Sequence, residues 1–551
     1  MNSAVGHQPS AVSLLVLMTM VAGCNHRQPI SRRGDGGPAV EVVEADKRRP
    51  DQPKLPLTDE KEPDDDVAHA QPMAAGNGIR GTIGAPHPDR RGKLVGDEDV
   101  FAWMDPGAPA DLGGFDYARV ELSGVPGLDL ALDILDGDGK RLMSINDGGP
   151  GEPEIMPNVG VDPAHTYYIR VREAGVPKGD GGQSYQLTVS SWKAADSDER
   201  EPNDDVAHAT PIRLTSGSAG DASGFFGRRR DDDWLRLALA GVPARDGRAT
   251  LRLELAPPEG VTASIKVAAD KETFAEARGA KNDELRLRNV GVEVAAGAVA
   301  IALRAVDGKS TEARWVLRLG VEPPLDGAER EPNNDVGHAT PLALTSGTGQ
   351  LSGFLWPGDA DVYRVTGAPA DALLSFDVDG VDKVDLKLER LGADGKAWLR
   401  ADDAGVGQGE LLPPARTAEG LVRVSGRARD TAFDAPYRLT ATVVQPAPDE
   451  EREPNDGPAT ATAWSVGSAT MRGRLAPRGD EDWYAFSATG APAGAHFAGP
   501  MPASVKIVDE QRRVVPPGTP LAAGKRYFVV VKASSDKGSN PRELYTVTLG
   551  Q

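Results

Sequence analysis

Residues 199–211 read EREPNDDVAHATP, and this phrase decides the organisation of the chain because it recurs. Related phrases begin at Glu60, Glu329 and Glu451, and their Glu-Pro pairs start at Glu62, Glu201, Glu331 and Glu453. Successive pairs lie 139, 130 and 122 residues apart. These spacings exceed the roughly 20–50 residues of a solenoid repeat, so each copy is a domain-sized unit. We predict four tandem domains over 60–195, 196–325, 326–447 and 448–551 (repeats 1 to 4), the last of them shortened.

Two further anchors follow each phrase in the same order. The second anchors are GDEDVFAW, RDDDWLRL, GDADVYRV and GDEDWYAF, beginning at Gly96, Arg230, Gly358 and Gly479. The closing anchors are YQLTV, WVLRL, YRLTATV and YTVTL, beginning at Tyr185, Trp315, Tyr437 and Tyr545. Between the anchors, segments such as 251–255 alternate apolar and polar residues, which indicates half-buried strands, and Gly-containing turns separate them. The pattern predicts an all-β chain of sandwich domains, with a hairpin lost from repeat 4.

The composition argues against several classes of function. The 551 residues include 62 Lys+Arg and 82 Asp+Glu, which gives a net charge of −20. Nucleic-acid binding and docking on anionic lipid both need a basic face. A single cysteine rules out intrachain disulfides and Cys-rich zinc sites. The sequence contains no P-loop, Gly-x-Ser-x-Gly or His-Glu-x-x-His motif, and the repeats leave no room for a catalytic domain, so we expect no enzyme activity.

The amino terminus indicates export and lipid attachment. Residues 11–23, AVSLLVLMTMVAG, are too few to span a bilayer, which takes about 20, and fit the apolar core of a secretory signal. They end before Cys24 in a sequence that resembles the bacterial lipobox. We predict a lipoprotein signal peptide over 1–23, acyl chains on Cys24, and a bacterial cell-envelope location, on an outer membrane. The alternative is a cleaved signal with an incidental cysteine. Residues 24–59, rich in Pro and charge, are expected to form a disordered linker.

The anchors together resemble the bacterial pre-peptidase C-terminal (PPC) family, which includes the collagen-binding domains of clostridial collagenases. The family pattern runs Glu-Pro-Asn-Asp, a Gly-Asp-x-Asp-aromatic strand, Asp-Leu-x-Leu, Tyr-Tyr-x-x-Val and a closing Tyr-x-Leu strand. Repeat 1 follows it nearly throughout, as at Leu128-Asp-Leu and Tyr167-Tyr-Ile-Arg-Val, whereas the middle of repeat 2 has drifted. The resemblance covers most of 60–551. It implies four tandem jelly-roll-like β-sandwich domains that help secreted enzymes to hold substrates or surfaces.

Acidic residues gather at the first two anchors of every repeat. In repeat 2, Glu199, Glu201 and Asn203 share one side of an extended stretch, and the second-anchor acids are expected on a strand beside it. Carboxylates this close cannot all stay ionised without a cation, and hard oxygen ligands suit Ca²⁺. In the collagen-binding relatives this segment and strand supply calcium ligands, so the resemblance implies the same here. Carried over by position, the ligands are Glu60, Glu62, Asp64, Asp65, Asp97, Asp99, Glu199, Glu201, Asn203, Asp204, Asp231, Asp233, Glu329, Glu331, Asn333, Asn334, Asp359, Asp361, Glu451, Glu453, Asn455, Asp456, Asp480 and Asp482.

Two qualifications accompany the calcium hypothesis. Repeat 3 has an additional Asn in place of Asp and is expected to bind more weakly. The alternative interpretation is that Glu-Pro-Asn-Asp serves only turn and capping chemistry. His69, His208 and His338 occupy one equivalent position in three different repeats, and zinc needs its ligands in one place, so we interpret them as surface histidines.

The sequence as a whole predicts a non-catalytic, lipid-anchored cell-envelope protein. Its tandem modules would hold extracellular protein or polysaccharide, with avidity arising from several weak sites. We expect a monomeric rod stabilised by Ca²⁺. The alternative function is a structural spacer or scaffold that presents a partner protein away from the membrane.

Overall fold

The computed structural model describes residues 55–550 except 75, 89–90, 105–115, 163–164, 180–181, 270–271, 370–371, 417–419, 428–429, 434, 465–467 and 492–493. These residues fall in one compact unit, 45–551. The predicted signal peptide and Cys24 lie outside the described residues. Part of the predicted disordered linker does not: Leu57–Asp59 form strand β1, so ordered structure begins before Glu60.

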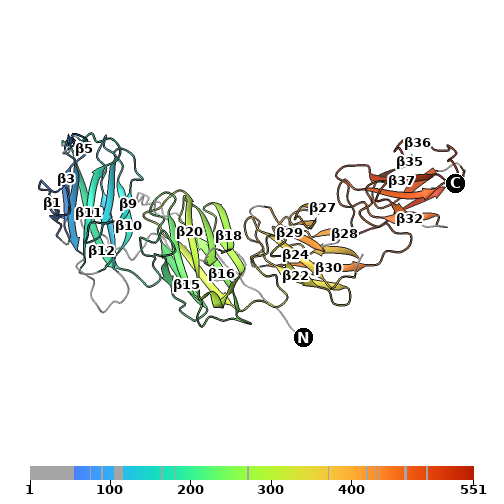
Figure 1. Cartoon of the computed structure of the whole chain (residues 1–551), viewed down its shortest axis with the longest axis horizontal. Coiled ribbons are helices and arrows are strands. Elements are labelled where there is room, and N and C mark those ends of the chain that lie inside the picture. Colours follow the sequence, from blue (N-terminus) through green and yellow to red (C-terminus); the bar gives the residue numbers. More distant parts are fainter. Residues whose placement is uncertain are drawn as a thin grey trace, which may run out of the picture. The chain divides into compact units, whose positions relative to one another are not determined.

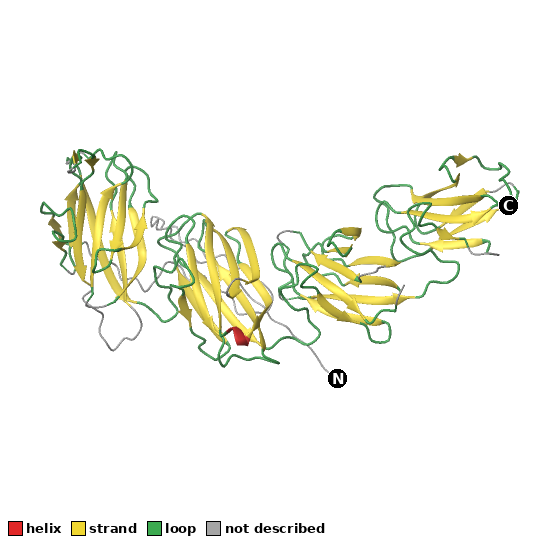
Figure 2. Ribbon diagram, in the orientation of Figure 1, coloured by secondary structure: helices red, strands yellow, loops and turns green. Residues whose placement is uncertain are grey.

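The described chain consists of strands joined by turns and loops (Figures 1 and 2). Its helical structure, within the described part, is a single 3₁₀ turn, η2 (Val294–Ala296). The all-β prediction is therefore confirmed. Among the described residues, no helix is long and apolar enough to cross a membrane.

Repeats 1 and 2 each contain two main sheets, whose strands follow in the order of their pairing. Repeat 1 has β1, β3 (Gly78–Thr82), β12 (Ser184–Lys193), β7 (Asp116–Leu122) and β10 (Glu154–Val161) in one sheet. Its other sheet has β2 (Gln71–Pro72), β6 (Glu98–Met104), β11 (Thr166–Glu173), β8 (Leu130–Leu135) and β9 (Arg141–Ile145), and β4 (His87–Pro88) pairs with β5 (Leu94–Val95). Repeat 2 has β13 (Thr210–Ile212), β15 (Asp232–Ala238), β20 (Ala298–Asp307), β17 (Thr262–Ala269) and β18 (Glu272–Lys281), then β14 (Ala219–Gly224), β21 (Trp315–Glu322), β16 (Arg248–Ala256) and β19 (Leu285–Glu293).

Repeats 3 and 4 follow the same order. Repeat 3 has β22 (Thr340–Ala343), β24 (Ala360–Thr366), β29 (Leu421–Ser425), β26 (Lys387–Leu391) and β27 (Ala397–Ala401), then β23 (Thr348–Gly353), β30 (Tyr437–Val444), β25 (Leu373–Val378) and β28 (Glu410–Arg416). Repeat 4 has β31 (Thr462–Ala463), β33 (Glu481–Ser487), β37 (Arg526–Ala533), β35 (Ala503–Asp509) and β36 (Val514–Val515), then β32 (Thr470–Gly473), β38 (Tyr545–Gly550) and β34 (Gly494–Ala498).

Both sheets of a repeat contribute to one hydrophobic core. The predicted alternation is clearest in β16, where Leu251, Leu253 and Leu255 are buried and the residues between them are less so. These leucines belong to the same core cluster as Ile301 and Leu303, which lie on β20 in the other sheet. Alternate side chains of each sheet are therefore removed from water against the facing sheet.

The topology places the second and closing anchors in different sheets of each repeat. The second-anchor strands β6, β15, β24 and β33 each pair in parallel with the short strand that follows the Glu-Pro phrase. The closing-anchor strands β12, β21, β30 and β38 lie in the other sheet. A long side chain on a closing strand can therefore reach the second-anchor acids across the interior.

Repeat 4 is shorter by one strand. In repeats 1 to 3 the sheet that contains the closing-anchor strand ends on β10, β19 or β28. The described part of repeat 4 has no counterpart of these strands, and its sheet ends on β34. The short hairpin strand β36 is retained. The loss is therefore a single edge strand, where the sequence predicted a whole hairpin.

Candidate metal centres

Backbone contacts bind the Glu-Pro phrase to the second anchor in the same way in every repeat. The residue two positions after the second glutamate accepts, at its backbone carbonyl oxygen, an N–H from the second-anchor strand. The N···O distances are 3.0 Å for Val100 to Asp64, 3.0 Å for Trp234 to Asn203, 2.9 Å for Val362 to Asn333 and 3.1 Å for Trp483 to Asn455. The intervening Glu-Pro peptide bond is cis in all four phrases. The first and second anchors are therefore adjacent, as predicted.

The two glutamates of each phrase have distinct backbone partners. The first glutamate accepts a backbone N–H at the end of a strand in the sheet that contains the closing anchor. Phe354 N, directly after β23, lies 2.6 Å from Glu329 Oε1, and Arg474 N, directly after β32, lies 2.6 Å from Glu451 Oε1. The second accepts the N–H of the residue two positions on, as in Asn333 N to Glu331 Oε2 at 2.9 Å. One oxygen of each second glutamate is thus used within the turn, and in repeats 3 and 4 the other oxygen, Glu331 Oε1 or Glu453 Oε1, is buried without a hydrogen-bond partner.

Three acids converge in each repeat. Their ligand oxygens lie within 4.8 Å of one another, and the groups are Glu62, Asp97 and Asp99; Glu201, Asp204 and Asp231; Glu329, Glu331 and Asp361; and Glu451, Glu453 and Asp482. In repeats 3 and 4 all three members are buried. The cross-anchor convergence predicted from the sequence is therefore present in every repeat.

Each three-membered group and the predicted ligands next to it form what we call the acidic cluster of that repeat. Several oxygens of the four acidic clusters are buried without a hydrogen-bond partner. They are Asp64 Oδ1 and Oδ2, Asp99 Oδ1, Asn203 Oδ1, Asp233 Oδ1, Glu331 Oε1, Asn333 Oδ1, Asp361 Oδ1, Glu451 Oε2, Glu453 Oε1, Asn455 Oδ1 and Asp482 Oδ1. A buried oxygen with no partner costs free energy, and more so when it carries charge. Within the described residues of repeats 1, 3 and 4, the acids of the three-membered groups form no ion pair with Lys or Arg. The donor set consists of oxygens, most of them from carboxylates and the rest from Asn amides, which is the set that Ca²⁺ prefers.

The aromatic residue that opens each closing anchor donates into the cluster. Tyr185 OH lies 2.5 Å from Asp99 Oδ2, Trp315 Nε1 lies 2.6 Å from Asp233 Oδ2, and Tyr545 OH lies 2.7 Å from Asp482 Oδ2. Tyr437 OH donates to Asp361 Oδ2 in the same manner. Sequence reasoning placed these aromatics only as strand markers. Their recurrence as residues with a polar tip was the signal that each has a partner.

Burial raises the pKa values of the clustered carboxyls. The pKa of Asp99 rises to about 9, that of Glu329 to about 7, that of Glu453 to about 9 and that of Asp482 to about 6. Burial is the largest cause in each case, because the charged form is poorly solvated there. Without a cation, these clusters therefore favour the protonated state of at least some carboxyls near neutral pH.

The remaining predicted ligands divide by exposure. The first acid of each second anchor is buried in all four repeats, with an exposed fraction of 8% for Asp97 and 1% for Asp231. The residue three positions after the second glutamate of each phrase is exposed, and these residues are Asp65, Asp204, Asn334 and Asp456. Of these, only Asp204 joins one of the three-membered groups. The exposed residues at the other three positions lie at the surface beside the clusters.

The three equivalent histidines are surface residues, as predicted. His69, His208 and His338 are more than half exposed, and each Nδ1 lies 2.8–3.0 Å from the aspartate three residues earlier. That hydrogen bond lowers the pKa of Asp66, Asp205 and Asp335. Each histidine therefore closes its own turn and lies outside the acidic groups.

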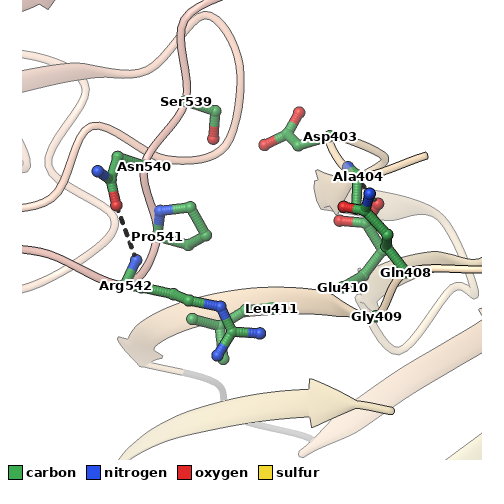
Figure 3. Close-up of a pocket in the computed structure, with 10 residues that line it drawn as sticks. All are labelled: Asp403, Ala404, Gln408, Gly409, Glu410, Leu411, Ser539, Asn540, Pro541 and Arg542. Atoms are coloured by element: carbon green, nitrogen blue, oxygen red, sulfur yellow. Dashed lines mark hydrogen bonds between the residues drawn. The ribbon is translucent and has the colours of Figure 1, made fainter. Parts of the chain in front are cut away.

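A separate cleft of about 320 Å³ lies apart from the acidic clusters (Figure 3). One wall is the 403–411 segment of repeat 3, with Asp403 and Glu410, and the other is the 539–542 loop of repeat 4. Asn540 Oδ1 accepts the backbone N–H of Arg542 at 3.2 Å, which shapes that loop. Burial raises the pKa of Glu410, whose carboxylate accepts the Ala404 N–H at 2.7 Å.

No family model and no curated protein matches the chain, so the resemblance to the PPC family stays a prediction. Among solved structures, the M60 catalytic domain with the CBM51-1 and CBM51-2 domains of Clostridium perfringens ZmpB is 12% identical over 44% of this chain and 36% of that chain, with a TM-score of 0.13. A triple jelly roll protein of an archaeal virus turret is 10% identical over 66% of this chain and 89% of that chain, with a TM-score of 0.14. The CUB1-EGF-CUB2 segment of human MASP-1/3 is 11% identical over 44% of this chain and 99% of that chain, with a TM-score of 0.13. This chain spans about a third of the clostridial chain, and TM-scores this low do not establish a shared fold or function.

Proposed function

We propose that this chain is a lipid-anchored, non-catalytic protein of the bacterial cell envelope. It consists of four tandem jelly-roll-like β-sandwich modules, which bind extracellular protein or polysaccharide, and the acidic clusters of repeats 1, 3 and 4 hold Ca²⁺. The observation that carries the calcium part is the set of buried carboxylate and amide oxygens without hydrogen-bond partners in repeats 1, 3 and 4.

The residues present fit a divalent cation of the calcium type. In repeat 3, Glu329, Glu331 and Asp361 bring three buried carboxylates together, and Asn333 adds an unpartnered amide oxygen. Repeat 4 has the same arrangement in Glu451, Glu453, Asp482 and Asn455. Bound there, the ion would neutralise carboxylates that otherwise repel one another, and its binding free energy would add to the stability of the fold.

The phrases of repeats 2 and 4 lie where one repeat meets the next. Glu453, in the phrase of repeat 4, forms a parallel bridge with Ala415 on β28 of repeat 3, and Glu450, just before the phrase, forms one with Arg472 on β32 of repeat 4. At repeat 2, Glu201 of the phrase forms a parallel bridge with Val159 on β10 of repeat 1, and Asp198, just before the phrase, forms one with Ser223 on β14 of repeat 2. A cation that fixes the phrase would therefore fix both neighbouring repeats.

Binding through several modules requires little affinity from any one of them. The described surface offers at least one aromatic contact, Trp398 of β27, whose exposed fraction is 41%. Tryptophan is enriched among residues that dominate binding energy. Retention of the full-length protein on insoluble collagen, cell-wall glycan and chitin, with calcium and with EGTA, tests this part. The binding role is rejected if none of the three retains the protein under either condition.

Calorimetry tests the calcium part separately. We expect the melting temperature to rise in millimolar Ca²⁺ and to fall in EGTA, while Mg²⁺ has a smaller effect because it requires stricter octahedral geometry. An unchanged melting temperature would remove the calcium hypothesis and leave the binding role untouched.

In repeats 2 and 4, the chain at the start of the phrase forms β-bridges both to the preceding repeat and to its own repeat. These bridges favour a second candidate function, a spacer that presents a partner protein away from the membrane. This candidate predicts a calcium-dependent change in small-angle scattering without retention on any matrix. A pull-down from a membrane extract would then recover a partner that the matrices do not.

A further inference from the structure

Repeat 2 neutralises its acids differently from the other repeats. Arg228 Nε lies 2.8 Å from Asp231 Oδ1, and the same guanidinium forms an ion pair with Asp204. Asp204 and Asp231 are two of the three acids that converge in this repeat, and the third is Glu201. A positive charge from the chain itself therefore lies among the candidate ligands.

The basic side chain is specific to this copy of the loop. Three residues before the first acid of the second anchor, the other repeats carry Leu94, Trp356 and Pro477. The backbone of the loop is nevertheless shared. The residue just before that acid has a positive φ in repeats 2, 3 and 4: 59° for Arg230, 84° for Gly358 and 87° for Gly479.

The hydrogen-bonding of the group agrees with this difference. Within the described residues, no oxygen of Glu201, Asp204 or Asp231 is buried without a partner. Repeat 2 retains one orphaned oxygen each on Asn203 and Asp233, and neither residue belongs to the converging group. In repeats 1, 3 and 4, by contrast, the converging groups themselves contain orphaned oxygens.

We propose that Arg228 is a built-in cation that takes the place of the metal ion in repeat 2. Its guanidinium supplies the positive charge that the converging acids need, so this repeat binds no Ca²⁺. A second cation brought among the same acids would lie against the guanidinium and would be repelled by it. The inference rests on the proposed function for the metal content of repeats 1, 3 and 4, but the exclusion of metal from repeat 2 is tested independently.

The test is the calcium stoichiometry of the full-length chain, measured by equilibrium dialysis for the parent protein and for Arg228→Met. Methionine keeps the unbranched aliphatic side chain and removes the charge. We expect the variant to bind one more ion than the parent, four against three. Arg229→Met is the matched control, because Arg229 is the exposed neighbour and forms no ion pair with these acids. It should leave the count unchanged.

The two proposals fail in different ways. A parent protein that binds no calcium refutes the proposed function, while the difference between variant and parent still decides the role of Arg228. An equal count in both overturns the built-in cation. Should Arg228→Met unfold in EGTA, millimolar Ca²⁺ is expected to refold it. A variant that stays unfolded in calcium also overturns the proposal, because the ion then cannot replace the guanidinium.

Discussion

Raising the pH in the presence of a chelator is expected to destabilise this protein between pH 5 and pH 8. The sign follows from the direction of the pKa shifts. A carboxyl whose pKa is raised by folding binds its proton more tightly in the folded state. Its favourable contribution is complete below the pKa of the unfolded chain and is lost as the pH rises through the folded pKa. Most carboxylate-rich proteins behave in the opposite way over the acid range, because their native ion pairs lower the pKa.

For Glu329 in repeat 3, the size of the effect follows from its pKa. Burial raises that pKa from 4.5 to about 7. Each tenfold change in proton affinity corresponds to about 1.4 kcal/mol, so ionisation of this one side chain costs the fold about 3 kcal/mol, most of it between pH 5 and pH 8. Asp482 in repeat 4, with a pKa raised from 3.8 to about 6, adds a cost of the same order that is complete at a lower pH.

The assay is denaturant unfolding of the full-length chain in EGTA at several pH values from 5 to 8, repeated in millimolar Ca²⁺. We expect the unfolding midpoint in EGTA to fall as the pH rises. In calcium the slope should flatten or reverse, because the ion competes with protons for the same oxygens. A midpoint in EGTA that stays constant or rises with pH would show that the clustered carboxyls are already ionised and compensated in the folded chain. The reasoning from burial would then be wrong.

Three further outcomes are expected. Asp361→Asn keeps the shape of the side chain but removes a charge from the repeat 3 cluster. It should raise the melting temperature in EGTA and weaken calcium binding, measured by calcium titration, by about tenfold or more. The control Asp379→Asn, at an exposed position, should change neither the melting temperature nor calcium binding. Tyr437→Phe removes the hydroxyl that donates to Asp361 and should cost about 1–3 kcal/mol in denaturant unfolding, so equal stability would contradict a role for this hydrogen bond. Leu253→Ala opens a cavity in the core of repeat 2 and should cost about 2–5 kcal/mol in the same measurement, with no effect on calcium stoichiometry.

The all-β class could be predicted because it depends on local periodicity. The alternation seen at 251–255 is the burial pattern of β16, and the second and closing anchors are strands in every repeat. The adjacency of the first two anchors was also predictable, since the same two acidic segments recur together four times. These features need only the period of a strand and comparison of the copies.

The rest of the site depends on contacts between residues distant in sequence. The hydroxyl of Tyr185 reaches Asp99 because the closing and second anchors lie in facing sheets, and no local pattern gives that arrangement. The exposure of Asp65 could not be separated from the burial of Asp64, because adjacent residues of a turn differ only in direction. Arg228 is missed by comparison of the copies, because the recurring anchor begins two residues later, at Arg230.

The four copies also separate two causes of the recurring phrase. The backbone contacts are common to all of them: the first glutamate accepts an N–H from the next sheet, and the carbonyl oxygen two residues after the second glutamate accepts one from the second-anchor strand. These contacts hold equally in repeat 2, where Arg228 lies among the acids. The phrase therefore has a structural reason to recur whether or not metal is bound, and its presence alone does not identify a calcium site. What distinguishes a metal centre from a turn with the same backbone is the balance of charge inside it. Repeats 1, 3 and 4 have converging acids with unpartnered buried oxygens, whereas repeat 2 has a guanidinium among its acids.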